Sequence, residues 1–223
     1  MKRLRVINLG LPKSGTTTLG KALRLSGLKT ADWKVRKGQS ADPAVAGQFV
    51  GDLMYRGYFD FGDPLFHLTE FDAFSEISLA RPDLNRWPQT DWGLIQTIID
   101  RHPGARFILS YRNAADHVDS MMRWTNLGSQ RLPRLSVPGL PSGFGQSREE
   151  LIRWVEGHEK FCRQVFKGRR DFLAYDIRDP DAPAEIGAFL GVEIKWWGTA
   201  NPNPDAAQTN TSQAHLVPEG RLN

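Results

Sequence analysis

The sequence predicts an α/β domain in which helices cover both faces of a mainly parallel sheet. Short apolar runs, typical of buried strands, alternate along the chain with segments of helical periodicity. The chain has 223 residues, of which 40% are hydrophobic. This length and composition suit one domain with a sizeable core.

Five short apolar runs are the candidate strands. Each is rich in apolar or aromatic residues and is bounded by turn residues or charges, which is the pattern of a buried strand. Because segments of helix length separate them, we expect these strands to pair in parallel. In chain order, the candidate strands cover residues 5–9, 28–35, 66–74, 106–111 and 171–177.

The segments between these strands have helical periodicity and recognisable ends. Asp42 and Pro43 form a cap-and-first-turn pair, which predicts a helix that runs from there toward Tyr55. Ser147 and Glu150 form a capping-box pattern and predict the start of the longest helix. In chain order, the predicted helices cover residues 15–26, 42–55, 91–101, 113–126, 147–166 and 182–190.

Two segments lack a regular pattern. Residues 132–145 are rich in Pro, Gly and Ser, and we expect a long loop of the kind that often covers a site. The end of the chain is rich in Asn, Pro, Thr and Gln, and we expect it to be disordered or laid over the domain in an extended form. We therefore assign residues 1–198 to one domain and residues 199–223 to a C-terminal tail.

Composition limits the classes of binding partner and indicates the cellular compartment of the protein. The formal net charge of +4 is compatible with an anionic nucleotide ligand, but no dense basic run with interleaved aromatics indicates nucleic-acid binding. The single cysteine, Cys162, cannot form an internal disulfide and predicts a reducing, cytoplasmic location. No run is long and apolar enough to span a membrane, and the N-terminus leads straight into the first strand, so we expect no signal peptide.

Residues 10–18, Gly-Leu-Pro-Lys-Ser-Gly-Thr-Thr-Thr, connect the first strand to the first helix. A glycine-rich turn between a strand and a helix start directs backbone N–H groups and the helix dipole at an anion. The spacing from Gly10 to Gly15 is that of a P-loop. The position after Gly15 is Thr16, where a nucleotide triphosphatase has lysine, and the lysine of this loop is Lys13. This displacement argues against ATP hydrolysis.

Two segments together resemble the phosphate-binding motifs of the sulfotransferases that use 3′-phosphoadenosine 5′-phosphosulfate (PAPS). Residues 12–17 resemble the family's 5′-phosphosulfate loop. Residues 107–112 form a strand that ends in Arg112, and Ser120 follows eight positions later, as in the family's 3′-phosphate motif. The two motifs occur in the family's order, about a hundred residues apart.

The resemblance implies a three-layer fold around a five-stranded parallel sheet of the P-loop kinase-like type. It also implies that Lys13 stabilises the leaving phosphate and that no metal is needed, because a sulfuryl group carries less charge than a phosphoryl group. Thr18 stands where many members have tryptophan, so the chain is similar to divergent bacterial members. The residues implied to bind PAPS are Pro12, Lys13, Ser14, Gly15, Thr16, Thr17, Thr18, Arg112 and Ser120.

The general base is expected on the segment that precedes the Arg112 strand. Glu76 resembles the catalytic glutamate of heparan-type members, Asp72 resembles an acidic position of bacterial relatives, and His67 resembles the histidine base of estrogen-type members. We rank them in that order. Four tryptophans could also face an acceptor, although aromatic residues more often fill a core: Trp33, Trp87, Trp92 and Trp124.

The leading functional hypothesis is transfer of a sulfuryl group from PAPS to a hydroxyl or amine of a small-molecule or lipid-like acceptor. One alternative is a sensor or scaffold that binds the product 3′-phosphoadenosine 5′-phosphate (PAP) without turnover. A second alternative is a small-molecule kinase, which would need a lysine after Gly15 and a carboxylate for magnesium. The sequence does not have that lysine.

Overall fold

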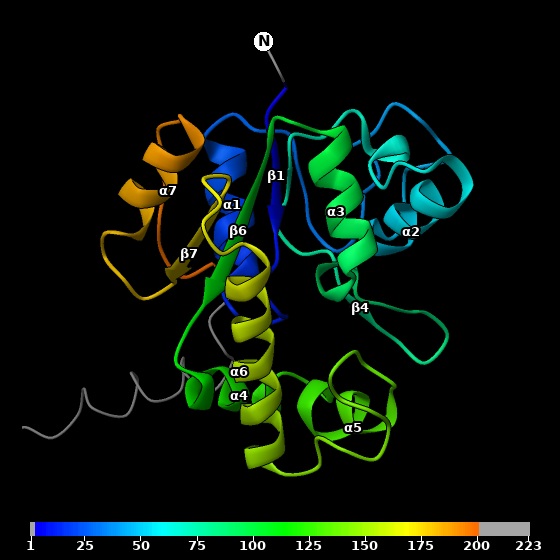
Figure 1. The fold of residues 1–223 in the computed structure, drawn as a ribbon, viewed down its shortest axis with the longest axis vertical. Helices are drawn as coiled ribbons and strands as arrows, with labels where there is room; N and C mark the ends of the chain where they lie inside the picture. The colour runs from blue at the N-terminus through cyan, green and yellow to red at the C-terminus, as the bar shows by residue number, and fades with distance from the viewer. Residues whose placement is uncertain (1–2, 201–223) are drawn as a thin grey trace, which may run out of the picture.

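The computed structural model describes residues 3–200, with a sheet of five strands at its centre (Figure 1). The strands are β1 (Arg5–Asn8), β2 (Thr30–Ala31), β3 (Ala73–Phe74), β6 (Ala105–Tyr111) and β7 (Phe172–Asp176). Their spatial order is β2-β3-β1-β6-β7, and each strand is parallel to its neighbours. The predicted α/β architecture with a parallel five-stranded sheet is therefore confirmed.

Helices cover both faces of this sheet, as predicted. One face is covered by α1 (Thr16–Leu25) and α7 (Ala182–Leu190), and the other by α2 (Val50–Phe61), α3 (Trp92–Arg101) and α6 (Arg148–Val165). Two further helices, α4 (Ala114–Arg123) and α5 (Leu132–Arg134), lie beyond the carboxyl ends of the strands (Figure 1). Successive residues of a strand point to opposite faces. Val6 of β1 therefore belongs to the cluster formed with α1 and α7, whereas Ile7 belongs to the cluster formed with α2, α3 and α6. The result is three layers.

A third apolar cluster lies beyond the carboxyl ends of the strands, at the lower end of Figure 1. Val118 and Met121 of α4 pack there with Leu151 and Val155 of α6. The chain between these helices passes through one π-helical turn, η3 (Leu127–Arg131), and then α5. This cluster builds a wall on the side of the sheet where ligands of open α/β folds bind.

Two predicted elements differ from the structure because of local turns, and a third, the strand predicted over 28–35, is shortened to Thr30–Ala31. Asp42 caps only a single turn, in which its carboxylate accepts a hydrogen bond from the Ala44 backbone N–H (2.8 Å). The turn ends at Gly47, which has a φ of 85° and donates its N–H to the Val35 carbonyl (2.7 Å), and α2 begins only at Val50. The strand predicted over 66–74 is shortened to Ala73–Phe74, because a 3-10 turn, η1 (Phe66–Leu68), precedes it. In both cases local turn chemistry overrides the apolar pattern.

Residues 132–145 and the segment before α3 form structures that the sequence pattern did not show. The loop over 132–145 is anchored by Val137 and Leu140, which are buried beside α6. Strands β4 (Leu79–Ala80) and β5 (Asn85–Arg86) form a small antiparallel hairpin. Strands of two residues are too short to produce a detectable alternation.

Asn8, the last residue of β1, joins three strands at the carboxyl edge of the sheet. Its side-chain Nδ2 donates to the Ser75 carbonyl (2.7 Å), just after β3. Its Oδ1 accepts from the backbone N–H groups of Ser110 in β6 (3.2 Å) and of Gly10 (3.1 Å). Asn8 is fully buried, so water cannot replace these hydrogen bonds.

We expect Asn8→Ala to lower the free energy of unfolding by roughly 2–4 kcal/mol, because it leaves several buried backbone groups without partners. Urea denaturation measures this change. Asn126→Ala is the matched control, since Asn126 is exposed and its replacement should change stability by less than about 0.5 kcal/mol. Equal effects of the two substitutions would contradict the role assigned to Asn8.

Candidate functional site

A cavity of about 1030 Å³ lies at the carboxyl edge of the sheet. All five strands of the sheet contribute to it from the residues that follow their ends. Residues 12–18 follow β1, Asp32 follows β2, Glu76 follows β3, Arg112 follows β6 and Ile177 follows β7. This is where an open parallel sheet leaves room for a ligand.

The glycine-rich loop enters the cavity with an unusual backbone. Gly15 has a φ of 101° and Lys13 a φ of 74°, both in the left-handed region. A side chain at position 15 would also collide with Ile177, so glycine is required there on two counts. Within residues 3–200, the backbone N–H groups of residues 15–18 donate no hydrogen bond. These groups stand at the start of α1 and can bind an anion.

Two buried histidines form hydrogen bonds with the backbone of this loop and of the residue before it. His117 of α4 donates from Nε2 to the Pro12 carbonyl (2.9 Å), and His158 of α6 donates from Nε2 to the Leu9 carbonyl (2.7 Å). A carbonyl can only accept, so both Nε2 atoms carry a proton. Burial lowers the pKa of His117 and of His158 to about 4. Both side chains are therefore neutral at neutral pH.

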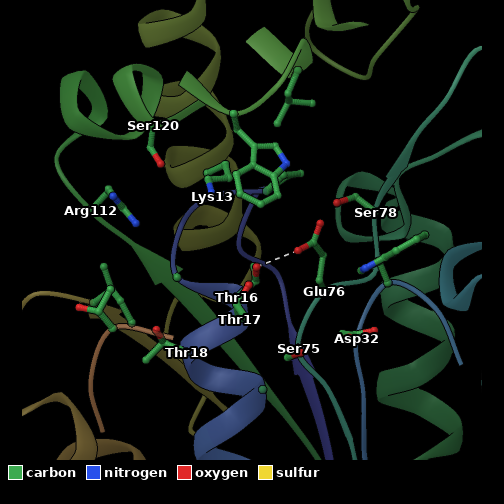
Figure 2. A pocket seen from close by; sticks show the side chains of 18 of the residues that line it. Lys13, Thr16, Thr17, Thr18, Asp32, Ser75, Glu76, Ser78, Arg112 and Ser120 are labelled. Carbon is green, nitrogen blue, oxygen red and sulfur yellow. Dashed lines mark hydrogen bonds between the residues drawn. The ribbon is translucent and has the colours of Figure 1, made fainter. Parts of the chain in front are cut away.

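Lys13 is a partly buried cation on the cavity wall. Its Nζ lies 3.7 Å from the centroid of the Trp124 ring, a cation–π contact. Burial lowers the pKa of Lys13, and the neighbouring Arg112 lowers it further. Figure 2 shows Lys13 on the same side of the cavity as Arg112 and Ser120.

Arg112 and Ser120 come from the second phosphate motif of the sequence and reach the same cavity (Figure 2). The Nε atom of Arg112 is buried and has no hydrogen-bond partner among the described residues. Burial lowers the pKa of Arg112, and the nearby Arg178 adds to this effect. An anion in this part of the cavity would satisfy the guanidinium.

Glu76 is the carboxylate in the middle of the cavity (Figure 2). Its Oε2 accepts a hydrogen bond from the Thr16 hydroxyl (2.8 Å), which links it to the glycine-rich loop. Burial raises the pKa of Glu76, while the Thr16 hydrogen bond lowers it. Asp32 raises the pKa further through charge repulsion. A carboxylate with a raised pKa is a stronger base once it is ionised.

The other two candidates for a general base lie outside this cavity. Asp72 precedes β3 and so sits at the opposite edge of the sheet, where it binds Arg3 (2.9 Å) and the Lys29 backbone N–H (3.0 Å). His67 lies in η1, edge-on to the Phe66 ring. Of the three candidates, the structure brings only Glu76 to the glycine-rich loop.

Two of the residues expected to bind the donor have other contacts. The Ser14 hydroxyl points away from the cavity and lies 2.8 Å from the Ser110 hydroxyl. The Thr18 hydroxyl donates to the Gly198 carbonyl (3.0 Å) and holds the end of the described chain beside the cavity. The side chain of Thr17 is exposed and lines the cavity. Residues 201–223 of the predicted tail lie outside the described residues.

The structure adds residues that sequence reasoning missed. Arg178 lies two residues after the end of β7, much as Arg112 follows β6, and this position could have revealed it. Arg131 and Ser78 have no comparable signal, because they lie on η3 and just before β4. Among the four tryptophans, Trp33 and Trp124 line the cavity, whereas Trp87 is buried in a core cluster.

Positive charge predominates in the cavity. Among the described residues, seven cations and three carboxylates line it, an excess that favours a multiply charged anion. Within residues 3–200, no cluster of three or more His, Cys, Asp or Glu side chains could hold a metal ion. The lining charges are Lys13, Arg24, Arg36, Arg81, Arg112, Arg131 and Arg178, with Asp32, Glu76 and Asp179.

Comparisons with known proteins give three findings. A family model described as a sulfotransferase domain matches residues 5–143. The crystal structure of a sulfotransferase from Alicyclobacillus acidocaldarius matches with a TM-score of 0.47 and 18% sequence identity, covering 95% of this chain and 91% of that chain. No curated protein matches the chain significantly.

Among the described helices, none has both the length and the apolar character needed to cross a bilayer.

The two histidines under the loop give a pH dependence of stability with a defined sign. Their pKa of about 4 in the folded chain is below the ordinary value of 6.5. Between pH 6.5 and pH 4 these histidines are protonated in the unfolded chain but remain neutral in the folded chain. The free energy of unfolding therefore falls as the pH drops toward 4. Each histidine should contribute a loss of about 2 kcal/mol between pH 7.5 and pH 5.

Urea denaturation of the wild type and of His117→Gln at both pH values tests this. The variant should lose about 2 kcal/mol less than the wild type between the two pH values, whatever its absolute stability. His158→Gln should behave in the same way. Equal pH dependence in all three proteins would show that the histidines are not held neutral.

Proposed function

Because the chain belongs to the sulfotransferase domain family, we propose that it transfers a sulfuryl group from PAPS to a hydroxyl or amine of a small-molecule or lipid-like acceptor, releasing PAP. One observation carries this proposal. The glycine-rich loop, the Arg112 and Ser120 motif and the half-buried Glu76 come from distant parts of the sequence and line one cavity (Figure 2).

The donor site follows from the groups that lack partners. The free N–H groups of residues 15–18 and the Thr17 hydroxyl would bind the 5′-phosphate at the start of α1. The unsatisfied Arg112 guanidinium and the Ser120 hydroxyl would bind the 3′-phosphate. Two separated phosphates thus account for two separated sets of donors in the cavity.

The transfer step needs a base, a stabilised leaving group and correct positioning. Glu76 would remove the proton from the acceptor hydroxyl or amine, whose oxygen or nitrogen then forms a bond to sulfur. The bond between sulfur and the bridging oxygen of the 5′-phosphate breaks, and its electron pair stays on that oxygen. The Lys13 ammonium, close to the phosphate-binding N–H groups, would stabilise the negative charge that develops there.

The Thr16 hydrogen bond to Glu76 couples the base to the donor site. Thr16 begins α1, so its backbone N–H lies at the proposed phosphate site while its hydroxyl orients the carboxylate. A phosphate bound there and the base would then be held by one residue. This arrangement supports acid–base chemistry next to the donor more than simple nucleotide storage.

The two alternative functions, a PAP-binding sensor and a small-molecule kinase, predict different results in the same assays. A PAP-binding sensor would bind PAP and show no transfer from labelled PAPS to any acceptor. A small-molecule kinase would use ATP with magnesium as donor. Parallel assays with labelled PAPS and labelled ATP therefore separate the three functions.

We expect Arg112→Ala and Lys13→Ala to have different effects. Arg112→Ala should weaken PAP binding at least tenfold, because it removes a charge-assisted contact to the 3′-phosphate. Lys13→Ala should reduce turnover by roughly a hundredfold or more, with a much smaller loss of PAP affinity. Calorimetry with PAP and turnover of labelled PAPS measure the two effects. Unchanged PAP affinity in Arg112→Ala would exclude the assigned 3′-phosphate site.

We expect Glu76→Gln to reduce kcat by roughly 10²–10⁴-fold, the usual contribution of a general base, while PAP affinity changes little. In the wild type, kcat should rise with pH and level off above the pKa of Glu76, because only the ionised carboxylate accepts a proton. Since burial raises that pKa, the midpoint should lie above the ordinary value of 4.5. A kcat of Glu76→Gln close to that of the wild type would assign the proton transfer to another group.

A further inference from the structure

The cavity extends past Glu76, on the side away from Arg112 and Ser120 (Figure 2). We call this region the acceptor side. It is formed by β4, the residues just before it, η3 and the segment after β2, and its lining includes Trp33, Ser78, Leu79, Ala80, Leu127 and Arg131. If the donor lies on the glycine-rich loop, an acceptor must enter from here to reach Glu76.

Arg131 is the feature of the acceptor side that needs an explanation. Its Nη1 donates to the Ala80 carbonyl (3.2 Å), which fixes the guanidinium against the hairpin. Its Nε is buried and has no hydrogen-bond partner among the described residues. Burial lowers the pKa of Arg131, and Glu76 opposes this effect only through a longer-range attraction.

Two other arginines that line the cavity, Arg36 and Arg81, have counter-ions. Arg36 binds Asp32 (2.6 Å) and Arg81 binds Asp83 (3.0 Å). Within residues 3–200 no carboxylate, Glu76 included, forms such an ion pair with Arg131. Arg131 is half-buried, and its buried Nε is a donor that no group of the described chain satisfies. The geometry therefore leaves a place for an anion at this guanidinium.

A second unsatisfied group lies in the same region. The Ser78 hydroxyl is buried without a hydrogen-bond partner among the described residues. Figure 2 shows it pointing toward the space in front of the Glu76 carboxylate. A hydroxyl and a guanidinium beside a carboxylate base could bind one molecule that has both a reactive hydroxyl and an oxyanion.

We propose that the acceptor carries an oxyanion, a carboxylate, phosphate or sulfate group, besides the group that is sulfated, and that Arg131 binds this oxyanion. The inference rests on the proposed function. Glu76 and the donor are both negative and would repel an anionic acceptor, so a cation is needed to offset them. The planar guanidinium of Arg131 can form two parallel hydrogen bonds with an oxyanion and fix its orientation. Ser78 would donate to the same molecule.

The test compares charged acceptors with their neutral counterparts in the presence of labelled PAPS. Suitable pairs are 4-hydroxyphenylacetate with its amide, glucuronate with glucose, and glucose 6-phosphate with glucose. We expect the charged member of at least one pair to have a kcat/KM at least tenfold higher. The pairs distinguish a carboxylate from a tetrahedral oxyanion, which glucose 6-phosphate represents. Binding of the same compounds to the PAP-loaded protein is measured by calorimetry.

Substitutions assign this preference to Arg131. Arg131→Gln should abolish the preference for the charged member and leave PAP affinity unchanged, whereas Arg131→Lys should keep part of it because the charge remains. Arg134→Gln is the matched control, because Arg134 is exposed and lies outside the cavity. It removes the same charge three positions away and should behave as the wild type. Thermal melting confirms that the variants are folded.

The outcomes separate the two proposals. Neutral acceptors used as well as charged ones, or a preference that survives in Arg131→Gln, would overturn the inference alone. So would a protein that binds PAP but binds no charged compound in the PAP complex. Failure of the wild type to bind PAP would instead overturn the proposed function.

Discussion

The backbone that leaves β1 is held in one conformation by buried side chains, and the cavity depends on it. Asn8 hydrogen-bonds to Gly10, and the two histidines hydrogen-bond to the carbonyls of Leu9 and Pro12. These contacts fix the turn that carries Lys13 in the left-handed region. Only this conformation directs a row of free N–H groups at one point. The site is thus preorganised at the cost of keeping two imidazoles neutral in the interior.

The same contacts join the helices of the third cluster to the sheet. His117 belongs to α4 and His158 to α6, so the helices of the third cluster are bound directly to the loop at the end of the sheet. Asn8 adds β3 and β6 through Ser75 and Ser110. A displacement of α4 or α6 would therefore move the loop, and α4 also carries Ser120. The geometry of the cavity therefore depends on how α4 and α6 pack.

Electrostatics explains why the cavity suits a reaction between anions. Its cations outnumber its carboxylates, and the buried Nε atoms of Arg112 and Arg131 have no hydrogen-bond partner among the described residues. Glu76 lies beside the glycine-rich loop, with a pKa raised by burial. Charges held in a partly dry cavity act more strongly than they would in water. The arrangement can attract two negatively charged molecules and still keep a base between them.

The sequence by itself determined the α/β class, the parallel sheet and the two motifs that meet in the cavity. It could do so because apolar runs, a glycine-rich turn and an arginine at a strand end are local patterns with local physical causes. The predicted element boundaries were wrong where a local turn replaced a helix or strand, as at Asp42. The hairpin of β4 and β5 was missed, because strands of two residues show no alternating pattern.

Only the tertiary structure decided which carboxylate stands beside the loop. Glu76 and Asp72 are four residues apart, but β3 lies between them and places them at opposite ends of the strand. The structure alone also revealed Arg131 and the histidines under the loop, because burial and the lack or presence of a partner depend on distant segments. Charge balance in a cavity is a property of the assembled fold, and no single stretch of sequence contains it.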